Sequence, residues 1–339
     1  MDKLLAGFED VVLLPASAGE VDWDEISLAT SLFGIPVASP VMINAMTGGT
    51  ETARAINARL GRFARRHGLA MAVGSETAAL RDSALTSSYT VVRDVNPDGL
   101  VLANVGMGTS ADLADRAVRL VGAGVLQVHW NIAQELAMRE GDRHFRGAIE
   151  RLREVAEAIK VPIVAKEVGQ GMTGAAALRF LNHGAQGIDV GGRGGTNFMT
   201  VEAWRKDETL SEEWGTWGLP TAVSLAEVLA TVPDTVPVVA SGGLRRGHDV
   251  AKSLTMGARL CGVAGPLLRL AADGDDDGLD QWITELHDTL KTIMVLMGAR
   301  TVQDLRTQPI VLRGSLKEWL AVRGMEGFVL RLARRCPWG

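Results

Sequence analysis

Residues 126–145, LQVHWNIAQELAMREGDRHF, begin as an alternating strand and then bring His129, Asn131, Gln134 and Glu135 within seven residues. A histidine can move or share a proton, primary amides orient polar groups, and a carboxylate can bind a hard cation such as Mg²⁺. The run REGDRHF that follows is predicted to form a rim leading into the next helix. So many polar side chains at the end of a buried strand indicate a functional site there.

The strand that ends at this cluster is one of eight similar units that must position it. Each unit is a short apolar, β-branched run, then a glycine or polar cluster, then an amphipathic stretch with helical spacing. The predicted strands are 41–46, 69–75, 100–106, 125–130, 161–169, 187–192, 237–243 and 260–265. Because the strands are apolar on both faces, they predict a single (β/α)8 TIM barrel, with a doubly wound open sheet as the alternative.

Three segments lie outside this repeat, within a chain interpreted as one domain over residues 1–339. Residues 1–40 form an N-terminal lead-in that we expect to cover the bottom of the barrel. Residues 193–219 follow the sixth strand and are too long for an ordinary connection, so we interpret this Trp-rich insertion as a lid. Residues 275–339 are expected to form C-terminal helices after a solvated acidic loop near residue 275.

Polar residues end nearly all of the predicted strands, at the face where a barrel carries its active site. They are Asn44, Thr47, Ser75, Asn104, His129, Asn131, Lys166, Glu167, Asp189 and Ser241. Alternation places Lys166 on the same face as Val164 and Val168, where a buried ammonium needs an anionic partner. A flavin whose reduced form is negatively charged at N1 would supply that partner.

Glycine-rich turns follow the last three strands. ASGGLRRGHDV and VAGPLL place backbone N–H groups and a helix N-terminus where barrels bind phosphate. GGRGGTNF, after the sixth strand, adds a second flexible loop with Thr196. These turns predict a ligand that carries phosphate.

Composition excludes several other classes of protein. The net charge of −5 and the scattered lysines and arginines leave no basic footprint for nucleic acid, and no apolar run is long enough for membrane insertion. Cys261 and Cys336 have no metal-type spacing and are expected to be unpaired thiols in a reducing cytosol. We therefore expect a cytoplasmic protein with a small-molecule partner.

Several strings, in order from about residue 8 to residue 324, carry a family resemblance. They are MINAMTGGT, MAVGSETAAL, LQVHWNIAQELAMREGDRHFRG, VPIVAKEVGQGMT, IDVGGRGGTNF, WGLPTAVSL, VPVVASGGLRRGHDVAKSLTMGA and GSLKEWL. Together they resemble the type 2, FMN-dependent isopentenyl-diphosphate delta-isomerases. The run H-x-N-x-x-Q-E on the fourth strand is the most specific part, because other FMN barrels share only the phosphate loops.

The resemblance implies a set of ligands and of residues that hold them. FMN would contact Ala45, Met46, Thr47, Ser75, Asn104, Lys166 and Thr196, and its phosphate would be held by Gly242, Gly243, Arg245, Ala264 and Gly265. His129, Asn131 and Gln134 would line the substrate side, and Glu135 would hold Mg²⁺ bridging to the diphosphate. NADPH or another donor would reduce the flavin catalytically, and the family analogy suggests a homotetramer or homo-octamer.

The implied reaction moves a double bond with no net redox change. A proton is added at one end of the alkene and removed at the other, through a state with tertiary carbocation character. Reduced flavin offers a protonated N5 and an electron-rich ring. Gln134 would then orient the alkene or relay a proton, and His129 would orient the pyrophosphate or donate a hydrogen bond to it.

The chain departs from the family pattern in two places. The family's Arg-Lys-x-x-His motif, which grips the diphosphate, is not found among Met1, Asp2 and Lys3 ahead of LLAGFEDV. Three explanations stay open: a chain that starts late, a different mode of diphosphate binding, or a substrate other than a simple prenyl diphosphate. In addition, Glu76 stands where the family usually has Gln and Thr77 where some members have Arg, and both changes oppose a dianionic substrate.

The leading hypothesis is an FMN-dependent isomerase that interconverts isopentenyl and dimethylallyl diphosphate. A second hypothesis keeps the flavin chemistry and changes the substrate to a larger prenyl or terpenoid compound that is isomerised or cyclised, which the aromatic Trp130 beside His129 would favour. A third is an FMN oxidoreductase acting on a hydroxy acid or dihydroorotate, and a fourth is a barrel retained only to bind flavin or to regulate. Reductant consumed in step with product would indicate the oxidoreductase.

Overall fold

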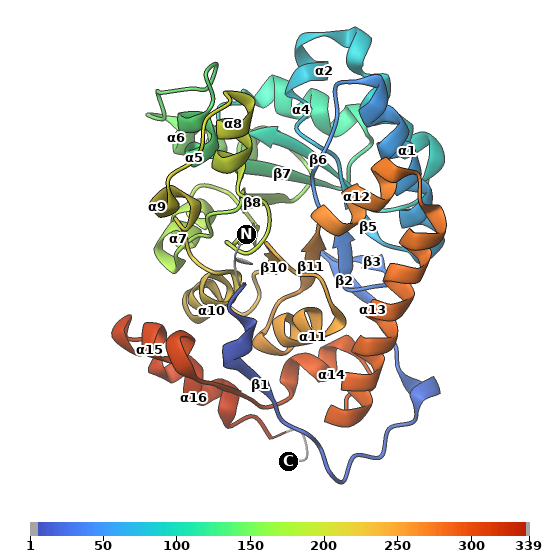
Figure 1. The fold of residues 1–339 in the computed structure, drawn as a ribbon, viewed down its shortest axis with the longest axis vertical. Helices are drawn as coiled ribbons and strands as arrows, with labels where there is room; N and C mark the ends of the chain where they lie inside the picture. The colour runs from blue at the N-terminus through green and yellow to red at the C-terminus, as the bar shows by residue number, and fades with distance from the viewer. Residues whose placement is uncertain (1–5, 337–339) are drawn as a thin grey trace.

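Eight parallel strands close into a barrel in the computed structural model, which describes residues 6–336 (Figure 1). The strands are β4 Val41–Ile43, β5 Ala70–Ala72, β6 Val101–Gly106, β7 Val125–Trp130, β8 Ile163–Glu167, β9 Gly187–Asp189, β10 Val238–Ser241 and β11 Leu260–Val263. They pair in chain order, and β11 pairs with β4 to close the circle. The predicted (β/α)8 barrel is confirmed, and the open sheet is excluded.

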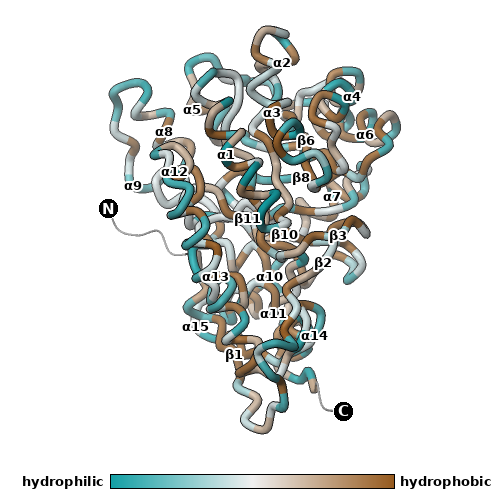
Figure 2. Tube along the Cα trace, turned by 90° about the vertical axis from the view of Figure 1, so that its right-hand side faces the viewer, coloured by the Kyte–Doolittle hydropathy of each residue, from teal (hydrophilic) through white to brown (hydrophobic). Residues whose placement is uncertain are grey.

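Helices fill the connections and surround the barrel. They are α1 Glu51–His67, α2 Thr77–Arg81, α3 Ser87–Val95, α4 Ala111–Leu120, α5 Ile132–Ala137, α6 Ala148–Ala158, α7 Gly174–Leu181, α8 Phe198–Arg205, α9 Glu212–Gly215, α10 Thr221–Thr231, α11 Gly247–Met256, α12 Gly265–Asp273 and α13 Asp276–Met297, with a 3₁₀ turn at Ser83–Leu85. Hydrophilic and hydrophobic colours alternate along these helices in Figure 2, as amphipathic helices require. Local signals set their ends: Thr50 caps α1 by accepting from the Ala53 N–H, and Gly68 ends it with φ 59°.

Apolar side chains form two layers, one inside the barrel and one between the strands and the helices. Met42, Leu102 and Val164 belong to the inner layer, whereas Val128 and Ala165 belong to the outer one. Successive residues of a strand therefore face opposite sides of the wall. This alternation decides which strand-end residues reach the barrel mouth.

The N-terminal segment contains a hairpin, β2 Thr30–Leu32 and β3 Ile35–Val37, that lies at the amino ends of the barrel strands. Leu32 and Val37 pack into the inner layer with Leu100, Val125 and Leu260. The end of the barrel opposite the strand-end polar residues is thus closed by apolar packing. Residues 1–5, which include Lys3, lie outside the described residues.

The C-terminal part is helical except for one strand that the sequence did not indicate. Helices α14 Val302–Thr307, α15 Gly314–Val322 and α16 Glu326–Ala333 flank β12 Ile310–Leu312, which pairs with β1 Val11–Leu13 after the 3₁₀ turn Phe8–Asp10; a further 3₁₀ turn spans Trp23–Glu25. The prediction of a solvated acidic loop near residue 275 is wrong, because α12 ends at Asp273 and α13 begins at Asp276. Asp275 caps α13 by accepting from the Gly278 N–H, and the following acids favour the positive end of that helix.

Two further sequence predictions concern the cysteines and membranes. Cys261 is buried and Cys336 is exposed, and both are free, as predicted. Between residues 6 and 336, no helix is long and apolar enough to cross a membrane.

Candidate active site at the carboxyl ends of the barrel strands

One layer of the barrel mouth is formed by residues paired across neighbouring strands. His129 on β7 is in register with Lys166 on β8, and Lys166 is in register with Asp189 on β9. By the alternation of side chains along each strand, all three face the barrel interior, as Val125 of β7 and Val164 of β8 do. The sequence placed these residues at strand ends, and the register brings them into contact.

Asp189 is the centre of this layer. It is completely buried, and its carboxylate accepts hydrogen bonds from Asn44 Nδ2 at 2.8 Å, from the Gly191 N–H at 3.2 Å and from the Ser241 hydroxyl. Lys166 Nζ lies 3.5 Å from the same carboxylate. A buried charge is tolerated only when it is paired and hydrogen-bonded, and Asp189 meets both conditions.

Lys166 therefore has an anionic partner within the protein. Its side chain is 7% exposed, and Nζ also donates to the Glu167 carbonyl at 2.9 Å. We predicted that burial of this lysine requires an anion, and Asp189 is the anion that the structure provides. A flavin is thus not needed to explain why Lys166 is buried.

His129 is held as a neutral imidazole. Burial, and to a lesser degree the charge of Lys166, lower its pKa to about 4. Asn104 donates through Nδ2 to the Val73 carbonyl at 3.2 Å, so its Oδ1 faces His129 Nδ1 at 3.0 Å and accepts the proton there. This hydrogen-bond assignment leaves Nε2 as an acceptor. We expected His129 to orient the diphosphate or to donate a hydrogen bond to it. With Nε2 as an acceptor, His129 of the free protein offers no such donor.

The short helix α5 carries the other polar residues of the motif. Asn131 Nδ2 lies 3.3 Å from Gln134 Oε1 and 3.0 Å from Glu135 Oε1, so one amide orients both neighbours. The Asp142 N–H donates to the second carboxylate oxygen of Glu135 at 2.9 Å. Arg143 fixes the charged loop against the end of α5 by donating to the Glu135 and Met138 carbonyls. This loop supports Glu135 rather than serving only as a rim.

Two residues of the insertion complete this cluster and were missed from the sequence. Gln134 Nε2 donates to Glu202 Oε1 at 3.3 Å, and Arg205 Nη1 donates to the other oxygen of Glu202 at 2.6 Å. Arg205 also bridges to Glu140 at 2.8 Å. Glu202 is 4% exposed although it lies on a surface insertion. An acidic residue within an amphipathic helix gives no sign of this contact.

Glycines after β9 and β10 pack backbone against backbone. A Cβ at Gly242 would lie 2.0 Å from the Gly192 carbonyl oxygen, and one at Gly243 would lie 2.3 Å from the Gly194 carbonyl. Both glycines have positive φ, 110° and 78°. Arg245 donates to the carbonyls of Gly243 and Gly194, so it ties the two loops together.

Helix α12 begins beside these loops, directly after β11. Ala264 is its N-cap, and a Cβ built at Gly265 would meet no atom within 4 Å. The nine-residue helix thus begins next to open space at the carboxyl end of the barrel, with Pro266, which has no N–H group, in its first turn. This geometry suits an anion such as phosphate.

The loops after β4 and β5 meet at the same end of the barrel. The Ala45 N–H donates to Asn44 Oδ1, and the Gly74 N–H donates to the Thr47 carbonyl at 3.2 Å. Ala45, Met46, Thr47 and Ser75 are partly buried. Thr196 is exposed on the loop after β9 and is farther out on the rim.

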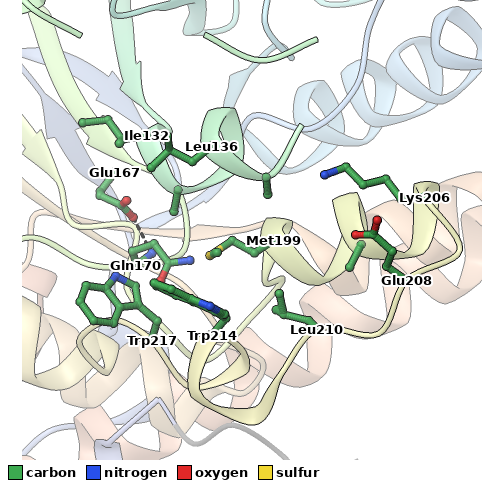
Figure 3. Close-up of a pocket in the computed structure, with 13 residues that line it drawn as sticks. Ile132, Leu136, Glu167, Gln170, Met199, Lys206, Glu208, Leu210, Trp214 and Trp217 are labelled. Carbon is green, nitrogen blue, oxygen red and sulfur yellow. Dashed lines mark hydrogen bonds between the residues drawn. The ribbon is translucent and has the colours of Figure 1, made fainter. Parts of the chain in front are cut away.

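A cavity of about 640 Å³ lies between α5 and the insertion (Figure 3). Its wall is mostly apolar and consists of Ile132, Ala133, Leu136, Ala137, Met199, Ala203, Leu210, Trp214 and Trp217, with Glu167, Gln170, Lys206 and Glu208 at its polar ends. In Figure 3, Trp214 and Trp217 lie on one side of the cavity, with Ile132 and Leu136 opposite them.

Glu167 and Trp130 both face away from the barrel interior. Glu167 lines the cavity and accepts from the Gln170 and Gly171 N–H groups at 2.6 and 3.0 Å, while burial raises its pKa to about 8. Trp130 packs against Phe180 of α7, with ring centroids 4.7 Å apart. Trp130 therefore does not line the mouth, and the support it was expected to give to a larger substrate is withdrawn.

Comparisons with known proteins agree with this geometry. A family model described as FMN-dependent dehydrogenase matches residues 110–312. The isopentenyl-diphosphate delta-isomerase of Symbiobacterium thermophilum is 45% identical over 335 residues, which cover 97% of this chain and 91% of that protein. The one from Moorella thermoacetica is 43% identical over 317 residues, covering 94% of this chain and 91% of that protein.

Solved structures support the fold alone. A putative lactate oxidase from Pediococcus acidilactici superposes with a TM-score of 0.67 at 18% identity, covering 91% of this chain and 84% of that one. A mandelate oxidase variant with an FMN adduct gives 0.66 at 19% identity, covering 91% and 90%.

The closed barrel and its loops at β9, β10 and β11, together with the family match, define an enzyme of the FMN-dependent barrel class. Within that class, the chain belongs to the isopentenyl-diphosphate delta-isomerase family. The resemblance drawn from the sequence motifs is therefore confirmed.

Proposed function

We propose that this protein is an FMN-dependent isomerase that interconverts isopentenyl diphosphate and dimethylallyl diphosphate without net redox change. The observation that carries the proposal is the hydrogen-bonded set of Asn131, Gln134, Glu135 and Glu202, which joins the fourth barrel strand to the insertion. Family membership supports the same reaction, because the curated relatives bear the name of this isomerase.

The residues present fit FMN. The N-terminus of α12, with Ala264 as its N-cap, and the close-packed Gly242 and Gly243 suit the phosphate, and Arg245 joins the loops after β9 and β10. The other residues proposed to hold the cofactor are Ala45, Met46, Thr47, Ser75, Asn104, Lys166, Thr196 and Gly265. Reduced flavin, when bound, supplies a protonated N5 and an electron-rich ring against which an alkene can be stacked.

The chain's own residues would bind and orient the substrate beside that ring. Asn131 and Glu202 hold both ends of the Gln134 amide, so its orientation beside the alkene would be fixed. His129 Nε2, an acceptor, would receive a hydrogen bond from the ligand rather than donate one.

Glu135 would hold Mg²⁺ in this proposal. Within residues 6–336 there is no group of three or more His, Cys, Asp or Glu side chains that could enclose a metal. A single carboxylate suits Mg²⁺ when diphosphate oxygens and water complete its shell. NADPH is proposed as the reductant that starts the cycle.

The direct test is to incubate FMN-reduced protein with isopentenyl diphosphate and Mg²⁺ and to follow dimethylallyl diphosphate by chromatography. We expect many turnovers for each NADPH oxidised. NADPH consumed in a one-to-one ratio with product would instead indicate an oxidoreductase, and absence of product would overturn the proposed reaction.

The cavity favours a second candidate substrate. Its volume of about 640 Å³ exceeds what a five-carbon chain fills, and its wall is largely apolar. The far end of a longer prenyl diphosphate or terpenoid chain could occupy it while the same flavin chemistry isomerises or cyclises the chain at the barrel mouth. Comparing kcat/KM for five-, ten- and fifteen-carbon diphosphates would decide between the candidates, and Trp214→Ala should affect only the longer ones.

Two finer features are also proposed. A homotetramer or homo-octamer is supported by exposed apolar side chains on α15 and α16, where Val322 is 88% exposed and Leu330 is 48% exposed. Size-exclusion chromatography with light scattering would test this assembly. The two unpaired cysteines support a cytoplasmic location, which fractionation of the producing cell would test.

A further inference from the structure

Glu76 is a buried carboxyl group with no apparent partner. It follows β5, and its side chain is 0% exposed. Neither of its carboxyl oxygens has a hydrogen-bond partner among the described residues. Its backbone is engaged, because the Glu76 N–H donates to the Asn104 carbonyl at 2.9 Å and the Glu76 carbonyl accepts from the Leu80 N–H at 3.0 Å. A buried polar group left in this way is costly, so it requires an explanation.

Glu76 is next to Ser75, whose carbonyl is bound by Tyr89, and Tyr89 joins two loops of the proposed flavin site. The Tyr89 hydroxyl donates to the Ser75 carbonyl at 2.7 Å, and a Cβ at Gly48 would lie 2.1 Å from the Tyr89 ring. Tyr89 therefore contacts the loop after β4, which carries Thr47, and the loop after β5. A change in charge at Glu76 would act on both loops.

The surroundings of Glu76 favour its uncharged form. Burial raises its pKa well above the ordinary value, and the one opposing interaction is the hydrogen bond with the Asn104 backbone. Burial, with the nearby Glu76, raises the pKa of Tyr89 to about 12. The groups that face the carboxyl are thus a phenol from α3 and a peptide group from β6, and the peptide group offsets the cost of a buried negative charge only in part.

We propose that Glu76 is a positioning residue of the flavin site, and that Tyr89 keeps the loops after β4 and β5 in place only while the buried Glu76 carboxyl beside it is a neutral carboxylic acid. The inference rests on the proposed flavin site. A protonated carboxyl group has nearly the shape of a glutamine amide, with one face that donates and one that accepts. Ionisation would place an unpaired charge beside Tyr89, loosen Thr47 and Ser75, and repel an anionic flavin.

The test measures FMN affinity from pH 6.5 to 9.5 by quenching of flavin fluorescence in the wild type, in Glu76→Gln and in Glu157→Gln. Glu157 is exposed on α6 and serves as the matched control. We expect the wild type and the control to lose affinity by about tenfold or more as Glu76 ionises, since one unit of pKa coupling is a factor of ten. Glu76→Gln should bind FMN as tightly at neutral pH and change little across the range. Equal pH profiles for all three, or loss of FMN by Glu76→Gln at pH 6.5, would overturn the proposal.

Two measurements on the flavin-free protein separate this inference from the flavin site itself. Infrared difference spectra at neutral pH should show a protonated carboxyl band that Glu76→Gln lacks, and absence of this band in the wild type would overturn the proposal. A raised folded-state pKa means that the stability of the wild type relative to Glu76→Gln falls as pH rises from the unfolded value toward the folded one. The variant should therefore melt at a higher temperature above neutral pH. Failure of all three proteins to bind FMN would contradict the flavin site, while these two measurements would still decide the state of Glu76.

Discussion

The side-chain amide of Gln134 donates a hydrogen bond to the carboxylate of Glu202 at 3.3 Å, which joins the helix after β7 to the insertion after β9. The same carboxylate accepts from Arg205, and the other end of the amide faces Asn131. The orientation of Gln134 thus depends on a residue 68 positions away in the sequence. The position of the insertion and the orientation of this amide are therefore linked through one hydrogen bond.

Glu202→Gln should lower kcat for isomerisation by about 10- to 100-fold, because small displacements of a positioned group cost about that much. The neutral amide weakens the pairing with Arg205 and removes a fixed acceptor for Gln134. Affinity for FMN should not change, because Glu202 does not touch the glycine loops. Glu212→Gln, on the exposed first turn of α9, is the matched control. An unchanged kcat in Glu202→Gln would show that the contact does not position Gln134.

Breaking the layer at Asp189 should destabilise the fold. Asp189→Asn leaves Lys166 buried without an opposing charge and replaces one of the two carboxylate oxygens that accept from Asn44 and Ser241. Losing one partner of a buried pair costs about 3–5 kcal/mol, which urea unfolding of the flavin-free protein would measure.

The double variant Lys166→Met with Asp189→Asn controls for this charge effect. It removes both charges, so it should recover part of the stability lost in Asp189→Asn alone. If the double variant loses as much unfolding free energy as the two single variants lose together, the two residues are not coupled.

The strands and the mouth were predictable from the sequence because each strand carries its own local signal. Alternation alone separates His129, which faces inward, from Trp130, which packs against Phe180. Our expectation that Trp130 would favour a larger substrate ignored this rule. The partner of Lys166 also follows from the barrel, since Asp189 is its register neighbour on the next strand.

The contact between Gln134 and Glu202 was not predictable in this way. It joins a six-residue helix to an insertion whose path is set by packing rather than by a repeated pattern. Strand β12 escaped prediction for a similar reason. It has three residues, and it exists because β1 of the N-terminal segment returns to pair with it.

His129 should make the protein sensitive to acid. Its folded-state pKa of about 4 lies below the ordinary value of 6.5, so the native state disfavours the charged form. The stability due to neutral His129 is present above pH 6.5 and is lost as pH falls toward 4. The shift corresponds to roughly 3 kcal/mol at most.

His129→Gln keeps a polar side chain and cannot take up the proton. Its unfolding free energy should fall less between pH 6.5 and pH 4 than that of the wild type, as measured by urea titrations at each pH. Nitrogen NMR of the flavin-free wild type at neutral pH should also show a proton on Nδ1 and none on Nε2. A proton on Nε2 would contradict the assignment made from Asn104.

Gly242→Ala should weaken FMN binding more than the small size of the added methyl group suggests. Its φ of 110° is unfavourable for alanine, and its Cβ would lie 2.0 Å from the Gly192 carbonyl oxygen, a backbone atom that cannot move without displacing the loop after β9. We expect an FMN dissociation constant at least about 100-fold higher, since strain of this kind costs about 1–3 kcal/mol for the backbone alone and the clash adds to it. Gly108→Ala is the control, because a Cβ there meets no atom within 4 Å. Circular dichroism would confirm that both variants fold, and an unchanged FMN affinity in folded Gly242→Ala would show that the phosphate is held elsewhere.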